Sequence, residues 1–171
     1  MSLTSSLTLA IAARLGQTLD LAEAKSSLNK TYAVGHTTGT GAGQADALWH
    51  DQRTLAPSGS EDLDLAGALA GILGGTAVFA RVKGLIVAAA AGNVNNVVVG
   101  ANVVNGWASL IGPTGASGGT VTLKPGAFFA AGCADAAGWS VTAATNDLLH
   151  VTNSGGVTPV TYDVVIIGAT A

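Results

Sequence analysis

One short pattern in the sequence matches the spacing of a nucleophilic serine. Gly115-Ala116-Ser117-Gly118-Gly119 fits the G-x-S-x-G of a nucleophile elbow, which requires a strand before the serine and a helix after it. Here Ile111-Gly112-Pro113 precedes the pattern, and a strand-like segment, 120–123, follows it. This context favours a glycine-rich surface loop over a catalytic serine.

The titratable side chains show no spacing typical of a metal or cofactor site. The histidines, His36, His50 and His150, are too far apart in sequence to form a paired-ligand motif. The single cysteine, Cys133, cannot form an intramolecular disulfide and is interpreted as a small packing residue. The glycine-rich run 39–43 lacks the third glycine of a dinucleotide fingerprint. We expect no metal and no cofactor.

The acidic residues leave two kinds of chemistry open. Asp62 and Asp64 alternate along a strand-like segment and would share one face, where they could form a solvated edge or hold Ca²⁺ with added carbonyl oxygens. The solvated edge is the favoured interpretation. A hydrolase would need a carboxylate pair in a cleft, and the spacing of Asp135, Asp147 and Asp163 does not favour one. We therefore expect the protein not to be an enzyme.

The charge content restricts the partners. The 171 residues include 7 Lys and Arg and 10 Asp and Glu, which gives 10% charged residues and a net charge of −3. Ordinary soluble domains carry about 25% charged residues. No basic stripe is available for a phosphate backbone, so we expect no nucleic-acid partner. A surface with so little charge tends to associate unless neighbouring subunits cover it.

Two apolar segments are candidate membrane spans. Segment 65–80 is shorter than the roughly 20 residues that a bilayer requires. Segment 85–104 contains four asparagines, whose amides are costly in hydrocarbon. We expect no membrane partner. The N-terminus has no basic region ahead of an apolar core, so we expect synthesis in the cytoplasm.

The first 45 residues differ in pattern from the rest of the chain. From Ser2 to Leu21, Thr and Ser alternate with Leu and Ile, which predicts a strand or an extended arm; a short helix over 9–15 is the alternative. Residues 25–45 are polar and glycine-rich, which indicates a loop or linker. We therefore divide the chain into an N-terminal arm with a glycine-rich loop, 1–45, and a β-sandwich domain, 46–171.

Beyond residue 46, short alternating segments recur with Gly, Pro or Asn turns between them. This spacing predicts an all-β fold, an antiparallel β-sandwich that is jelly-roll-like. Segments 78–87 and 96–100 are expected to pair as a hairpin around Gly92-Asn93. Residues 67–75 fit either a helix or a loop. The other expected strands are 47–55, 61–65, 120–124, 127–130, 139–142, 148–152 and 160–167.

The three tryptophans are candidate anchors for a core or an interface. Trp49 and Trp139 lie inside strand-like segments, which favours the core. Trp107 lies between turn residues, so core and subunit contact are equally compatible with its position.

Several segments resemble small structural proteins found among the head genes of tailed bacteriophages. The resemblance covers most of residues 3–171, and its motifs describe strands and turns rather than chemistry. The segments are Ala47-Leu48-Trp49-His50-Asp51-Gln52-Arg53-Thr54-Leu55, Glu61-Asp62-Leu63-Asp64-Leu65, Val121-Thr122-Leu123-Lys124-Pro125-Gly126, Asp147-Leu148-Leu149 and Tyr162-Asp163-Val164-Val165-Ile166-Ile167-Gly168.

This resemblance implies a capsid decoration, or cement, protein. Such a protein is β-rich and usually trimeric, sits at local threefold positions of the shell, and clamps neighbouring major capsid proteins. The expected location is the capsid surface of a virion assembled in a bacterial cytoplasm. We expect an N-terminal arm to add a strand to a neighbour's sheet edge, with Leu7, Leu9 and Ile11 as contact residues. A trimeric tail-fibre or receptor-binding module is the alternative.

Overall fold

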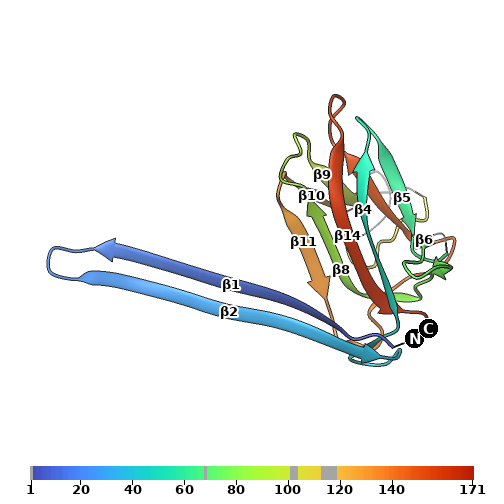
Figure 1. Ribbon diagram of the computed structural model, residues 1–171, viewed down its shortest axis with the longest axis horizontal. Helices are drawn as coiled ribbons and strands as arrows, with labels where there is room; N and C mark the ends of the chain where they lie inside the picture. Colours follow the sequence, from blue (N-terminus) through green and yellow to red (C-terminus); the bar gives the residue numbers. More distant parts are fainter. Residues whose placement is uncertain (1, 68, 101–103, 113–118) are drawn as a thin grey trace.

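The computed structural model describes residues 2–67, 69–100, 104–112 and 119–171, and within these ranges the chain forms strands and no helix. The prediction of an all-β antiparallel fold is therefore confirmed. Figure 1 shows a β-sandwich and a long hairpin that projects from its base. The strands are β1 (Ser5–Thr18), β2 (Glu23–Thr38), β3 (Gln44–Ala45), β4 (Ala47–Leu55), β5 (Ser60–Asp64), β6 (Leu69–Ala70), β7 (Thr76–Ala77), β8 (Arg81–Ala89), β9 (Val97–Gly100), β10 (Thr120–Leu123), β11 (Phe128–Gly132), β12 (Trp139–Ser140), β13 (Leu148–Asn153) and β14 (Val160–Ala169).

Two sheets pack face to face to form the sandwich. Sheet I has the strand order β11-β8-β14-β4, with β12 paired to β8, and sheet II has the order β10-β9-β13-β5. Side chains alternate between the two faces of each strand, and the inward-facing set forms the core. Core residues include Trp49, Leu85, Val87, Tyr162, Val164 and Ile166 from sheet I, and Leu63, Val97, Val99, Leu123, Leu149 and Val151 from sheet II.

The prediction that segments 78–87 and 96–100 pair as a hairpin is wrong. Strand β8 pairs with β11 and β14, whereas β9 pairs with β10 and β13 in the opposite sheet. Both strands carry inward apolar side chains, and each buries them by facing the other across the core. In the connection between them, the Asn93 side chain donates to the carbonyl of Thr161 at 2.8 Å and accepts from its N–H at 2.9 Å. These bonds hold the crossing against β14.

Strands β1 and β2 form an antiparallel hairpin with unbroken register, from Ser5 opposite His36 at the base to Thr18 opposite Glu23 at the tip. The prediction of a loop over 25–45 is wrong, because β2 continues to Thr38 and the glycine-rich loop is confined to 39–43. The polar residues of β2 satisfy their backbone groups on β1 and need not bury side chains. Segment 9–15, the alternative helix, lies within β1.

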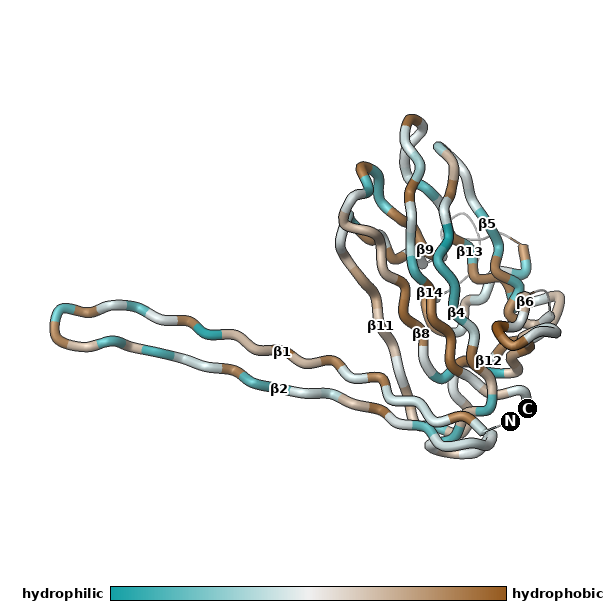
Figure 2. Tube along the Cα trace, viewed as in Figure 1, coloured by the Kyte–Doolittle hydropathy of each residue, from teal (hydrophilic) through white to brown (hydrophobic). Residues whose placement is uncertain are grey.

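The described residues of segment 67–75, whose sequence fits a helix or a loop, form turns and the short strand β6. Strands β6 and β7 pair around a tight turn, in which the N–H of Gly71 donates to the carbonyl of Gly75 at 2.9 Å. Figure 2 shows hydrophobic residues along β8 and β14 of the sandwich, and hydrophobic and hydrophilic residues alternating along the hairpin.

Candidate functional site

The hairpin has one apolar and one polar face. Directly paired residues of an antiparallel ladder point to the same side, so the register assigns each side chain to a face. We call one side the apolar hairpin face; its members are Leu7, Leu9, Ile11, Ala13, Leu15, Leu28, Lys30, Tyr32 and Val34, with Ser5 and His36 at the base and Gln17, Ala24 and Ser26 near the tip. The opposite side, the polar hairpin face, carries Ser6, Thr8, Ala10, Ala12, Arg14, Glu23, Lys25, Ser27, Asn29 and Thr31.

Charged groups are distributed unequally between the faces. On the polar hairpin face, Glu23 forms ion pairs with Arg14 at 3.2 Å and with Lys25 at 2.5 Å. On the apolar hairpin face the one formally charged residue is Lys30, whose Nζ lies 5.7 Å from the centroid of the Tyr32 ring. Both cations of the polar face are therefore paired with the single carboxylate of Glu23, and the apolar face carries a single cation.

Large apolar side chains on this face remain exposed. Leu15 is 77% exposed, Leu28 53% and Tyr32 57%, and Leu9 and Ile11 are also exposed. A monomeric soluble protein rarely exposes so many neighbouring apolar groups unless they bind something. A two-stranded hairpin is also only marginally stable in water without further packing. The apolar hairpin face is therefore the candidate functional surface of the molecule.

A groove of about 310 Å³ lies where the hairpin meets sheet I. Leu7, Leu9, Tyr32 and Val34 line it from the hairpin, and Ile86, Phe128, Ala130 and Gly132 line it from β8 and β11. Beyond this junction the hairpin diverges from β11 (Figure 1). The two surfaces thus form the sides of an open angle, with apolar side chains facing into it.

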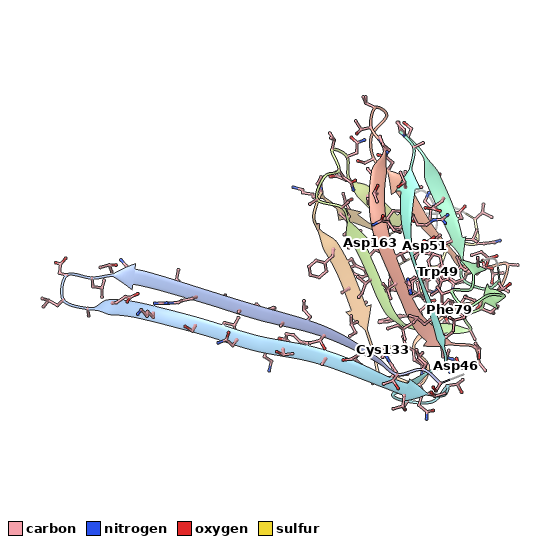
Figure 3. The ribbon with its side chains drawn as sticks, in the orientation of Figure 1. Asp46, Trp49, Asp51, Phe79, Cys133 and Asp163 are labelled. Carbon is pink, nitrogen blue, oxygen red and sulfur yellow. The ribbon has the colours of Figure 1, made fainter. Side chains whose placement is uncertain are left out.

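Buried polar groups fix the base of the hairpin. His36 is 2% exposed; its Nδ1 lies 3.1 Å from Ser5 Oγ, and its Nε2 lies 2.9 Å from the carbonyl oxygen of Cys133. The N–H of Leu3 donates to Thr38 Oγ1 at 2.7 Å, and Thr38 Oγ1 donates to the carbonyl of Leu3 at 3.0 Å. These bonds tie both strands of the hairpin together and to the segment after β11; Cys133 is labelled there in Figure 3.

Lys83 provides a second anchor. Its side chain is fully buried, and Nζ donates to the carbonyl oxygens of Thr40 at 3.2 Å, Gly41 at 2.5 Å and Gln44 at 2.8 Å. Desolvation by burial, followed by repulsion from Arg81, lowers the pKa of Lys83. The three carbonyls satisfy all three ammonium protons, so the loop after β2 is held to β8 of the sandwich.

The predicted contact residues divide into two groups. Leu7, Leu9 and Ile11 lie on the apolar hairpin face, with Leu7 half-buried at the junction and the other two exposed. Trp107 does not offer a contact surface: it is 4% exposed within the core, and its Nε1 donates to the carbonyl of Ser140 at 2.8 Å. Subunit contact at Trp107 is thus corrected to core packing. Trp49 is buried and Trp139 packs partly buried against the same core, as predicted.

The sequence interpretation missed half of this surface. Leu28, Tyr32 and Val34 come from β2, within the segment expected to be a loop, and Phe128 comes from β11. The usable signal was the alternation over 28–34, which mirrors that of β1 across the turn at 19–22. Phe128, at 58% exposure, gave no signal, because its outward orientation depends on the pairing with β8.

The outward face of sheet II carries a hydrogen-bonded row of three polar residues. His150 Nδ1 lies 2.7 Å from Asp62 Oδ1, and His150 Nε2 lies 2.9 Å from Thr152 Oγ1. These groups are neighbours because β13 pairs directly with β5. Asp64 instead accepts the N–H of Ala66 at 2.9 Å. Within the described ranges, no three His, Cys, Asp or Glu side chains are grouped to hold a metal ion.

The remaining chemistry candidates are dispersed. Asp163 accepts from Gln52 Nε2 at 2.8 Å, Asp135 caps the N–H of Ala137 at 2.6 Å, and Asp147 caps the N–H of Ala144 at 2.6 Å. Each carboxylate therefore has a local structural role. The serine of the G-x-S-x-G pattern lies outside the described residues.

Comparisons with protein-family models, with curated proteins and with solved structures found no match to this chain. Among the described residues, no helix has the length and apolar character to cross a membrane.

Proposed function

We propose that this protein is a structural component of a bacteriophage virion, which decorates the capsid shell and stabilises it. The observation that carries the proposal is the amphipathic hairpin, whose exposed apolar face projects from a folded sandwich. A projecting element of this kind can reach across a boundary between neighbouring subunits. An apolar face on it provides the binding energy, and the buried anchors His36 and Lys83 fix its direction.

The strand order of the sandwich supports a viral structural role. Taken in chain order, β4, β5, β8, β9, β10, β11, β13 and β14 are distributed so that every connection except β9 to β10 crosses between the sheets. Two four-stranded antiparallel sheets linked in this way are the arrangement of a jelly roll, an architecture shared by viral capsid and lectin domains. We interpret the sandwich as a jelly roll on this basis.

The proposed mechanism involves no bond chemistry. A protein that binds the assembled shell and not its separated subunits stabilises the shell in proportion to occupancy. Many such contacts on one particle act together. The proposed assembly is a homotrimer at local threefold positions, bound to the major capsid protein on the outer surface of the virion. The low charge content supports a surface that is largely covered in its working state.

The test is to prepare heads and tails from the phage that carries the gene, each lacking this protein, and to measure cosedimentation with the purified chain. We expect saturable binding to expanded heads and none to tails. A variant with residues 12–29 replaced by Asn-Gly retains the anchored base of the hairpin and should bind heads much more weakly. Binding to tails or to host cells instead of heads would overturn the proposal in favour of a tail-fibre or receptor-binding module.

A further inference from the structure

Beyond the groove, the described residues of the chain do not cover the apolar hairpin face. The anchors at His36 and Lys83 fix the base, and the hairpin leaves the sandwich beyond Leu9 and Tyr32, the last hairpin residues that line the groove. At about 3.4 Å per residue, a 14-residue strand such as β1 extends about 48 Å. Most of its length therefore carries an apolar face with no neighbour among the described residues of the same chain.

The outward face of sheet I is apolar over β8 and β11, whereas β14 and β4 add the polar residues Thr161, Thr54, Gln52 and His50 to it. The register places Ile86, Ala88, Phe128, Ala130 and Val165 on this face, opposite to the core side. The solvent-facing side of an antiparallel sheet normally carries polar residues, whereas the outward positions of β8 and β11 are apolar. Among the described residues of β11, β4, β8 from Gly84 onward and β14 up to Ile167, the register places one formally charged side chain on this face, Asp163.

We propose that the hairpin of one copy packs with its apolar face on the outward face of sheet I of a second copy. This inference deepens the proposed function and rests on it for the homo-oligomeric assembly. The partner chemistry is self-complementary: each copy presents both surfaces, so every copy donates a hairpin and accepts one. Such a head-to-tail contact forms a ring of identical contacts when the rotation from copy to copy closes.

Charge identifies a second copy as the occupant. The apolar hairpin face carries one cation, Lys30, and the outward face of sheet I carries one anion, Asp163. Asp163 is exposed and accepts one hydrogen bond, from Gln52. Two apolar surfaces of the same chain with single opposite charges can pair without leaving a buried like charge.

The available area is sufficient when each copy makes two contacts. Beyond the groove, about nine residues of β1, from Ala10 to Thr18, extend about 30 Å, and a hairpin about 10 Å wide presents about 300 Å² of planar surface there. Matched by an equal area on sheet I, each hairpin contact buries about 600 Å². A copy that donates one hairpin and accepts another takes part in about 1,200 Å² of contact, above the lower limit of about 1,000 Å² for a specific interface.

The experiment is sedimentation velocity of the full chain over a range of concentrations. Leu9→Asp is compared with Ala10→Asp, its matched control, because the two adjacent residues lie on opposite hairpin faces. We expect Leu9→Asp and Phe128→Asp each to weaken self-association at least tenfold, and Ala10→Asp to leave it within about twofold of wild type. Circular dichroism of each variant verifies that the strands are retained.

Charge reversal tests the identity of the occupant. Lys30→Asp and Asp163→Lys are each expected to weaken self-association about fivefold, and the double variant is expected to restore it. The proposal is overturned if the wild-type chain is monomeric throughout, if Ala10→Asp is as disruptive as Leu9→Asp, or if the double variant fails to restore association. A monomeric chain that still binds heads would refute this inference alone, whereas an oligomer that ignores heads would refute the proposed function alone.

Discussion

At the scale of single residues, polar groups buried inside the chain determine where the apolar groups can be exposed. Lys83 and His36 use backbone carbonyls as partners, so neither requires a carboxylate near the junction. Because an unsatisfied buried donor costs about 1–3 kcal/mol, these groups favour one geometry of the hairpin base over alternatives. These two side chains thus contribute to the direction of the hairpin.

The buried phenol of Tyr162 makes the free energy of unfolding depend on pH in the alkaline range. Tyr162 is fully buried, and its hydroxyl donates to Glu61 Oε1 at 2.8 Å, while Glu61 also accepts from Arg53 Nε at 3.0 Å. Desolvation by burial, followed by the hydrogen bond to Glu61, raises the pKa of Tyr162 well above its usual range. The phenol therefore stays neutral in the folded chain at pH values where it ionises in the unfolded chain.

We predict that this contribution is complete below about pH 10, the ordinary tyrosine pKa, and is lost as pH rises above it, at up to about 1.4 kcal/mol per pH unit. Urea unfolding from pH 8 to 11 measures it. The Tyr162→Phe variant lacks the hydrogen bond to Glu61, so its free energy of unfolding should be about 1 kcal/mol lower at neutral pH. Above pH 10 its stability should decline less steeply than that of wild type. Tyr32→Phe, on the exposed hairpin, is the control and should follow wild type. Parallel curves for wild type and Tyr162→Phe would contradict the prediction.

At the scale of elements, the junction between hairpin and sandwich depends on a position without a side chain. Gly132 ends β11 directly beneath Leu7 and Val34. A Cβ at this position would lie 2.6 Å from Leu7 Cδ2 and 2.8 Å from Val34 Cγ1, both shorter than van der Waals contact. The absence of a side chain allows the apolar hairpin face to rest on β11.

We therefore predict that Gly132→Ala destabilises the hairpin base by about 1–2 kcal/mol, because overpacking forces these side chains to shift. Hydrogen exchange should become faster in β1 and β2, while the strands of sheet II remain protected. Gly92→Ala is the control, since a Cβ there meets no atom within 4 Å. Unchanged exchange in β1 and β2 would show that the base does not depend on this contact.

The sequence pattern predicts where most strands of the sandwich lie but not how they pair. The sandwich strands after residue 46 were recognisable because alternation reports which side chains face a core. Alternation does not report which sheet a strand joins, so β8 and β9 were wrongly paired although both strands were correctly located. Strand β2 was missed since most of its side chains are polar or small and exposed, and its stability comes from the ladder with β1.

The candidate site was predictable in part for the same reason. Leu7, Leu9 and Ile11 follow a clear period of two, which located one strand of the apolar hairpin face. The second strand and Phe128 depend on long-range pairing. Trp107 was ambiguous because turn residues flank it, yet its backbone N–H donates to the carbonyl of Leu148 at 2.8 Å and draws it into the core. Local pattern carries no information about such contacts.

At the scale of the whole molecule, a rigid sandwich presents a long apolar hairpin in a fixed direction. In the proposed function, this arrangement separates two tasks: the sandwich provides a stable body, and the hairpin provides contact with neighbours. The central claim is that occupancy of the shell by this chain, through its hairpin, makes the shell more resistant to disruption.

The most direct test is the temperature at which filled heads release their DNA, measured with a dye while purified protein is titrated onto heads that lack it. The account predicts that the release temperature rises with added wild-type chain and reaches a plateau at saturation. The variant with residues 12–29 replaced by Asn-Gly should produce little or no rise at the same concentrations. A release temperature that stays unchanged at saturating wild-type protein would contradict the account.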